Sequence, residues 1–251
     1  MTDRAAFLAT YVTPNAPPNA PTFNPSHLTL PSSFPYPLRI SLYTAVFCAL
    51  KRGDLVDSLF TYFVDSANND ATETFLAARS AITTTVLFSG APQVLPASLA
   101  LAGQARFRGL EVPSNDRGHV TESTLQLGRE THTDIYKASA NSAVFSMLGE
   151  FVGDVEYALV CMGFGLFMGG EGLKEKELVL AAAITAMGAR RQAGSHLKAC
   201  FGFGWGLEEV KAVVEMVEGM AEYLGVKGAA GYDVEKLQLE ALATLAASEA
   251  K

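Results

Sequence analysis

The sequence predicts an all-α protein, a bundle of helices preceded by an extended, proline-rich N-terminal arm. From residue 38 onward, apolar side chains recur at spacings of three and four residues, the period of a helix that buries one face. Glycine, proline and short polar stretches separate these segments, and no segment shows the alternation typical of a half-buried strand. The 251 residues are enough to bury a large core without disulfide bonds.

Residues 1–37 are predicted to form the arm. Eight of the eleven prolines lie before Arg39, so we expect this segment to be extended or polyproline-like and not helical. The arm also carries apolar side chains, among them Phe7, Phe23 and Phe34, and has more of them than a solvated tail usually has. We therefore expect it to wrap around the body of the protein or around a partner subunit.

Eleven helices are predicted in the body. Residues that favour a helix start mark several of them. For example, Glu208 and Glu209 lie in the first turn of the predicted helix 207–224, where the helix dipole favours carboxylates. The polar break at 106–118 is rich in turn-forming residues and separates a first part, 38–105, from a second part, 118–251. The predicted helices span 38–51, 54–67, 71–88, 92–103, 120–138, 140–150, 153–168, 173–187, 190–203, 207–224 and 232–248.

The two parts of the body are predicted to be related copies of one helical unit. Moving the sequence by 135 positions, without a gap, aligns Gly53 with Gly188 and Gly90 with Gly225. Each copy would be a helix, a glycine turn, a second helix, and a third helix that ends at glycine. Few other residues are identical between the copies, so the first copy is interpreted as degenerate.

Charge and hydropathy argue against two classes of partner. The formal net charge is -7 and the pI is about 5.1, whereas binding to nucleic acid requires clustered lysine and arginine. No uncharged apolar run reaches the roughly 18 residues that a membrane span needs. Neither terminus reads as a targeting signal. We expect a cytoplasmic protein with no nucleic-acid or membrane partner, although a mitochondrial or peroxisomal location stays open.

The cysteines do not suggest a metal site or a disulfide framework. Cys48, Cys161 and Cys200 lie in apolar stretches, without C-x-x-C spacing or an adjacent histidine pair. We interpret all three as reduced, buried thiols. The sequence predicts no metal and no cofactor.

The segment from Glu177 to His196 is the predicted site of chemistry. If the chain reverses at Gly188, Glu177 lies about 16 Å and His196 about 12 Å from the turn, so their side chains can meet. A carboxylate beside an imidazole in apolar surroundings can transfer protons near neutral pH, because desolvation raises the pKa of the acid. A purely structural ion pair has the same residue types, so that interpretation stays open.

Several short sequence pieces follow one another in order between residues 118 and 225. They are Leu127-Gly128-Arg129-Glu130, Phe164-Gly165-Leu166-Phe167, Gly172-Leu173, Lys176-Glu177-Leu178-Val179-Leu180, Gly188-Ala189 with His196, Gly204 with Glu208-Glu209-Val210, and Tyr223-Leu224-Gly225. Through these pieces the chain resembles the carboxymuconolactone decarboxylase family, part of the superfamily that contains the alkylhydroperoxidase AhpD. The resemblance implies an AhpD-like helical bundle and a homo-oligomer. In the first copy, Leu42 and Thr61 stand where Glu177 and His196 stand in the second.

The resemblance also implies an activity. In the decarboxylase branch, a Glu and a His take part in proton transfer without a cofactor, and these roles fall on Glu177 and His196. The implied enzyme is a lyase that acts on a small organic acid or lactone. The peroxidase branch requires a C-x-x-C pair, and those two positions hold Ala189 and Gln192 here. Thiol peroxidase activity is therefore not expected.

Three further residues are candidates for substrate binding. Arg190 and Arg191 replace a segment that is more acidic in the decarboxylase branch, and guanidinium groups that face a pocket would favour a small anionic ligand. Trp205 follows the site and is a candidate to line the same pocket. The alternatives are a solvated helix start for the two arginines and ordinary packing between helices for the tryptophan.

A second class of function competes with the lyase. A catalytically silent member of the superfamily that acts as a scaffold or assembly subunit would explain the missing cysteines, the altered acidic segment and the long arm. A thiol peroxidase that uses Cys200 is a third hypothesis, and it lacks a resolving thiol. His27, His119 and His132 are expected to be solvated, because they lie in the arm or in polar surroundings.

Overall fold

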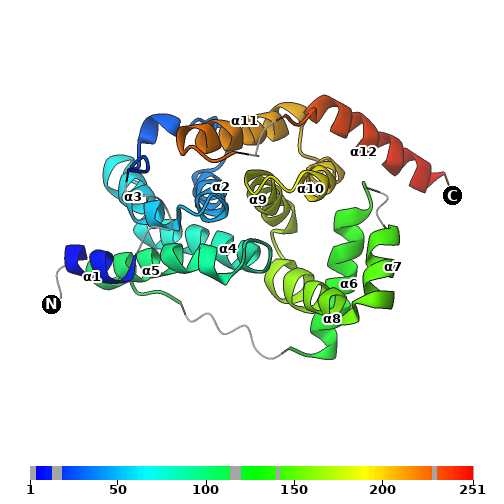
Figure 1. The fold of residues 1–251 in the computed structure, drawn as a ribbon, viewed down its shortest axis with the longest axis horizontal. Coiled ribbons are helices and arrows are strands. Elements are labelled where there is room, and N and C mark those ends of the chain that lie inside the picture. The colour runs from blue at the N-terminus through cyan, green and yellow to red at the C-terminus, as the bar shows by residue number, and fades with distance from the viewer. Residues whose placement is uncertain (1–3, 13–18, 114–119, 140–141, 228–230, 251) are drawn as a thin grey trace.

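The computed structural model describes residues 4–12, 19–113, 120–139, 142–227 and 231–250. Within these ranges the chain forms twelve α-helices and no β-strand, so the predicted all-α class is confirmed (Figure 1). The helices are α1 (Arg4–Tyr11), α2 (Tyr36–Ala49), α3 (Val56–Thr61), α4 (Ala71–Ser89), α5 (Ala91–Arg108), α6 (Glu122–Tyr136), α7 (Ser142–Phe151), α8 (Gly153–Tyr157), α9 (Leu173–Ala186), α10 (Arg190–Gly202), α11 (Leu207–Tyr223) and α12 (Val234–Glu249).

Four shorter elements complete the described chain. Two are 3-10 turns, η1 (Pro25–His27) and η2 (Gly53–Leu55), and two have π-helical geometry, η3 (Tyr62–Ser66) and η4 (Ala158–Met168). All eleven predicted helical segments are present, with ends displaced by a few residues. Some are composite, because the segment predicted at 54–67 is built from η2, α3 and η3.

The expectation that the arm contains no helix is wrong for its first residues. Helix α1 spans Arg4–Tyr11 and precedes Pro14, the first proline of the chain. Proline prevents a helix only where it removes a backbone donor or clashes with the preceding turn, and residues 4–11 contain none. After the prolines begin, the described part of the arm contains only the short turn η1 before α2 starts at Tyr36, within the predicted end of the arm.

The arm packs against the body, as expected. Leu30 and Phe34 are buried in the main core, and the backbone N–H of Leu30 donates to the Tyr43 hydroxyl at 2.8 Å. Arg52 donates to the carbonyl oxygen of Pro21 at 2.7 Å. Burial raises the pKa of Tyr43 to about 12, so this hydroxyl keeps its proton.

Helices α2 and α9 lie side by side at the centre of the molecule, with α4 against both (Figure 1). Helix α9 also contacts α10 and α11, and every residue from Glu177 to Ala186 is buried. Such a segment is buried on all sides, which is typical of a core helix, and apart from Glu177 and Thr185 it is apolar. Its alanines, Ala181, Ala182 and Ala183, have short side chains that allow the neighbouring helices to approach closely.

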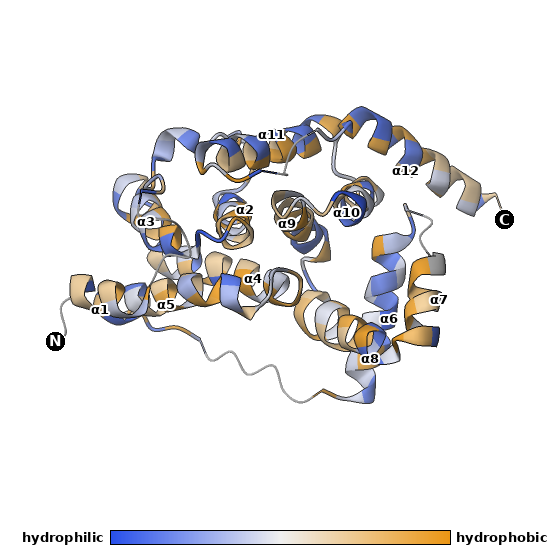
Figure 2. Ribbon diagram, in the orientation of Figure 1, coloured by the Kyte–Doolittle hydropathy of each residue, from blue (hydrophilic) through white to orange (hydrophobic). Residues whose placement is uncertain are grey.

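The main core takes residues from both predicted parts of the body, 38–105 and 118–251. Helices α2, α4, α9 and α11 all contribute buried residues to it, and Figure 2 shows the apolar side of α11 facing α2 and α9. A second, smaller apolar cluster lies where α6, η4, α9 and α10 meet, with Phe164 and Leu180 among its buried members. The predicted boundary therefore does not separate two independent cores, and the division into domains stays a prediction.

Two glycines allow α6 and η4 to pack backbone against backbone. A Cβ atom on Gly128 would lie 2.0 Å from the carbonyl oxygen of Val160, and one on Gly165 would lie 2.3 Å from that of Thr124. Only glycine permits so close an approach. This contact fixes the position of α6, which carries a tyrosine of the candidate site.

No helix in the described ranges combines the length and the apolar character that crossing a membrane requires.

Candidate functional site

Glu177 and His196 are in direct contact, as the sequence predicted. Helices α9 and α10 are joined by a turn at Gly188, which has a φ of +71°. The reversal places Oε1 of Glu177 2.6 Å from Nδ1 of His196. The side chain of Glu177 is 0% exposed and that of His196 is 2% exposed. The two residues form a buried acid–imidazole pair.

Tyr136 extends the pair into a chain of three groups. Its hydroxyl oxygen lies 3.2 Å from Nε2 of His196. When the imidazole is neutral and its Nδ1–H donates to Glu177, Nε2 is free to accept the tyrosine proton. Tyr136 is partly exposed, whereas both members of the pair are buried. It is therefore the member of the chain nearest to solvent.

Burial sets the proton affinities in this chain. Desolvation raises the pKa of Glu177, and the charge and hydrogen bond of His196 partly oppose that shift. Burial also raises the pKa of Tyr136, and the charge of Glu177 adds to the effect. A higher pKa brings the carboxyl group closer to an imidazole in proton affinity, which favours transfer between the two.

Aromatic rings surround the imidazole. The ring of Phe88 on α4 lies 6.2 Å from that of His196, and the ring of Tyr136 lies 5.6 Å away. The ring of Phe164 on η4 packs against the rings of Phe88 and Tyr136, with a centroid distance of 6.0 Å to each. Oε2 of Glu177 is buried and has no hydrogen-bond partner among the residues that the structure describes. The pair thus lies in the apolar setting that the sequence predicted.

His132 is only partly exposed, whereas the sequence predicted a solvated side chain. It lies one helical turn before Tyr136 on α6, and its ring centroid is 4.0 Å from that of Phe145. Its Nε2 is buried and forms no hydrogen bond within the described part of the chain. Burial lowers its pKa, so the neutral form is favoured.

The other two histidines have different outcomes. His27 is partly buried, because its ring stacks on that of Tyr223 at a centroid distance of 3.8 Å. His119 lies outside the described residues.

The predicted substrate-binding residues do not join the pair. Arg190 and Arg191 are exposed, and Arg190 donates to the carbonyl oxygen of Gly231 at 2.6 Å. Trp205 lines a separate cavity, and neither Glu177 nor His196 is among the residues that line it. The structure thus separates these three side chains from the buried pair, and substrate binding by them stays a prediction.

The three cysteines are free and buried. Cys200 lies one helical turn beyond His196, and burial raises its pKa well above the ordinary value of a thiol. A thiol held in its protonated form is a poor nucleophile. Among the described residues, no group of three or more His, Cys, Asp and Glu side chains is arranged to hold a metal ion.

Comparison with known proteins returned no match, either among protein-family models or among curated proteins. The resemblance to the carboxymuconolactone decarboxylase family stays a prediction from the sequence pieces described above.

Proposed function

We propose that this chain is a carboxymuconolactone decarboxylase-like protein that moves a proton to or from a small organic acid or lactone, without a cofactor. The observation that carries the proposal is the hydrogen-bonded chain that links the buried pair Glu177 and His196 to the partly exposed Tyr136. An imidazole held between a carboxylate and a hydroxyl has a fixed orientation and a defined proton donor and acceptor.

Each member has a distinct role in this proposal. Glu177 orients the imidazole through Nδ1–H and stabilises the imidazolium when Nε2 takes up a proton. His196 is the general base or acid. Tyr136, the partly exposed member, is the group that a substrate reaches first, and its hydroxyl passes the proton between substrate and imidazole. Lyase chemistry that changes the protonation of a carbon next to a carboxylate or carbonyl requires such a group.

The helix boundaries support the accompanying proposal of an AhpD-like fold with two copies. When the sequence is moved by 135 positions, α2 falls on α9, the segment from α3 to η3 falls on α10, and α4 falls on α11. The starts and ends of the paired helices agree to within two residues. Gly90 and Gly225, which end the third helix of each copy, both have positive φ. Since the first copy has Leu42 and Thr61 at the positions of the pair, each chain carries one proton-transfer site.

A scaffold function is the second candidate, and two observations favour it. Both members of the pair are buried, as in a structural ion pair. Helices α7 and α8 also expose large apolar side chains, including Met147, Val155 and Phe151, the last of which is 74% exposed. Exposed apolar side chains gathered on adjacent elements are typical of protein–protein contact. Assembly as a homo-oligomer through this face belongs to this proposal.

One experiment separates the two functions. Small carboxylates and lactones are screened by thermal shift, and stabilising compounds are tested for turnover by the wild type, His196→Gln, Glu177→Gln and Tyr136→Phe. As an enzyme, the protein should lose about 100-fold or more of its activity in His196→Gln while keeping its fold. Tyr136→Phe keeps the ring and its packing and removes only the hydroxyl, so it should also lose activity while keeping its stability if that hydroxyl passes the proton.

The scaffold function makes a different prediction, which alanine variants of the pair test. No compound is turned over, and Glu177→Ala or His196→Ala costs about 1–3 kcal/mol of stability, because a buried partner loses its hydrogen bond. Turnover that only follows the folded fraction in all variants would contradict the proton-transfer proposal.

A further inference from the structure

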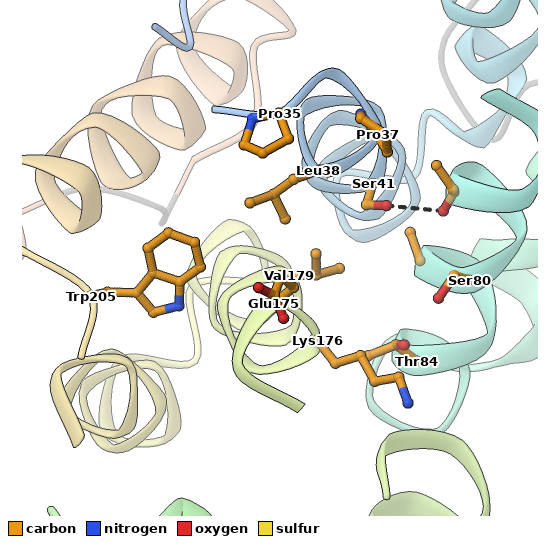
Figure 3. A pocket seen from close by; sticks show the side chains of 12 residues that line it. Pro35, Pro37, Leu38, Ser41, Ser80, Thr84, Glu175, Lys176, Val179 and Trp205 are labelled. Atoms are coloured by element: carbon orange, nitrogen blue, oxygen red, sulfur yellow. Dashed lines mark hydrogen bonds between the residues drawn. The ribbon is translucent and has the colours of Figure 1, made fainter. Parts of the chain in front are cut away.

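A cavity of about 320 Å³ lies between α2, α4 and α9, beside Trp205. Figure 3 shows its walls: the start of α2 contributes Pro35, Pro37 and Leu38, α4 contributes Ser80 and Thr84, and α9 contributes Lys176 and Val179. Its size is near the lower end of the range of about 300–1,000 Å³ for small-molecule sites. Because neither Glu177 nor His196 lines it, an inference about this cavity does not rest on the proposed function.

Trp205 forms a fixed wall of the cavity. Its ring is stacked with Phe34 of the arm at a centroid distance of 6.1 Å, and the ammonium of Lys174 lies 4.5 Å from its centroid. The indole N–H donates to the carbonyl oxygen of Lys174 at 3.1 Å. These three contacts hold the ring in place, so the wall exists before a ligand binds. Preorganised walls reduce the entropy lost on binding.

Thr84 brings a hydroxyl without a partner to this apolar cavity. On either side of it, the hydroxyls of Thr83 and Thr85 donate to the carbonyl oxygens of the residues four positions earlier, each at 2.9 Å. Thr84 is 2% exposed, and its hydroxyl forms no hydrogen bond to any residue that the structure describes. Its oxygen is not among the buried side-chain atoms that lack a partner, so the hydroxyl is open to the cavity and can donate to a ligand there.

Two other groups favour an acidic ligand head. Ser80 lies one turn before Thr84 on α4, lines the same cavity, and likewise has no hydrogen-bond partner among the described residues. Lys176 lines the cavity as a cationic side chain, and its ammonium donates to the carbonyl oxygens of Met168 and Gly169. Glu175 also lines the cavity, and because it is exposed, solvent screens its negative charge.

From these observations we infer that the cavity is a binding site for a small aliphatic monocarboxylate. The hydrocarbon chain lies against Pro35, Leu38, Val179 and the indole, where it is removed from water. The carboxylate accepts hydrogen bonds from Ser80 and Thr84 and is attracted by the charge of Lys176. The site is distinct from the proton-transfer chain, and α9 is the element that contributes to both.

Trp205 provides a direct test, because it is the only tryptophan of the chain. Its fluorescence is followed while the full-length protein is titrated with hexanoate, octanoate and 1-hexanol. We expect a saturable change with both acids and a Kd that falls about fourfold for each added methylene group. Hexanoate should bind about tenfold or more tightly than 1-hexanol, because a charged head makes stronger hydrogen bonds than a hydroxyl.

Three variants on α4 locate the binding. Thr84→Val keeps the shape of the side chain and should weaken hexanoate binding by about tenfold or more, since it removes a donor to a charged group. Ser80→Leu should abolish binding by filling the cavity. Thr83→Val is the matched control, because its hydroxyl is already bonded to a backbone carbonyl and does not line the cavity, so its Kd should equal that of the wild type. Far-UV circular dichroism confirms that each variant is folded, and Ala77→Leu replaces Ser80→Leu if the latter is not.

Three results would overturn the inference. The first is the lack of a saturable fluorescence change with either acid. The second is binding that survives the filled cavity, which would place the ligand elsewhere. The third is equal affinity for hexanoate and 1-hexanol, which would exclude a site for carboxylates.

Discussion

Glu177 shows how one buried side chain depends on another. A carboxylate without exposure to water is unstable unless a partner compensates for the lost hydration, and His196 provides a hydrogen bond of 2.6 Å. The opposing effects leave the pKa of Glu177 raised. A buried, hydrogen-bonded acid–imidazole pair can be catalytic or structural. The role is catalytic only if a substrate can reach Tyr136 and His196.

The thiol of Cys200 should take no part in peroxide chemistry. Its pKa is raised by burial, and the two positions that hold cysteines in the peroxidase branch are alanine and glutamine. Purified protein should therefore show no thiol-dependent turnover of hydroperoxides, measured with dithiothreitol as reductant. Robust turnover that disappears in Cys200→Ser would contradict this prediction.

His132 should make the protein sensitive to acid. Its pKa in the folded protein is lowered from the ordinary 6.5 by burial, so below that pH the unfolded chain binds a proton more readily than the folded protein does. The stability provided by neutral His132 is present above pH 6.5 and is lost as the pH falls through the lowered value. Urea unfolding between pH 7.5 and 5 should show a smaller loss of stability in His132→Phe than in the wild type.

His27→Phe is the control for the experiment on His132. Its ring is also in an aromatic contact, but with Tyr223 and far from the site in sequence. If His132→Phe and the wild type lose equal stability on acidification, His132 is not the group responsible.

The sequence was sufficient to predict the contact between Glu177 and His196, because both residues lie on consecutive helices joined by one glycine turn. It was not sufficient for Tyr136 or His132. Both lie on α6: the contact of Tyr136 with His196 depends on how α6 crosses α10, and the burial of His132 depends on Phe145 and Phe164. Helical periodicity predicts which face of a helix is buried, but it does not predict which other helix packs against that face.

At the scale of elements, the helix boundaries were predictable because glycines, prolines and capping residues mark them. Helix α1 was missed because the many prolines of the arm were taken to prevent a helix anywhere in it, including in the residues before the first proline. The π-helical geometry of η4 was also not predicted, since the segment 153–168 reads as one ordinary apolar helix. The glycines of this segment do not by themselves indicate a π-helix. Their close contact with the backbone of α6 is seen only in the folded structure.

The glycine contact between α6 and η4 gives a prediction. Gly128→Ala places a Cβ 2.0 Å from the carbonyl oxygen of Val160, so the two elements must separate. We expect a loss of about 1–3 kcal/mol or more in the free energy of unfolding, as in other overpacked contacts. Because α6 carries Tyr136, the hydrogen bond to His196 should also be disturbed.

Gly219→Ala is the matched control for this helix substitution. Gly219 is exposed within α11, and a Cβ there would meet no atom within 4 Å. This change should stabilise the protein by up to about 1 kcal/mol, through helix propensity alone. Urea denaturation of both variants measures the difference, and equal stabilities would contradict the close approach of α6 and η4.

At the scale of the molecule, the two predicted parts of the body share one main core. Helix α9 of the second part lies against α2 and α4 of the first, so neither part is expected to fold without the other. The arm adds a further connection, because it contacts residues of both parts. Arg52 lies in the first part and Tyr223 in the second, and both are hydrogen-bonded to the arm.

Removing the arm should therefore destabilise the whole protein. Deletion of residues 1–36 removes the buried side chains of Leu30 and Phe34 and leaves Trp205 without its stacked ring. Burial of each large apolar side chain contributes about 1.5–3 kcal/mol, so we expect a loss of about 3 kcal/mol or more and a lower Tm. Deletion of residues 1–11 is the comparison, because no described residue of α1 is buried and this change should cost much less. Differential scanning calorimetry measures both truncations, and light scattering reports any change in oligomer mass. If neither truncation changes the Tm or the mass, the arm does not contribute to the fold.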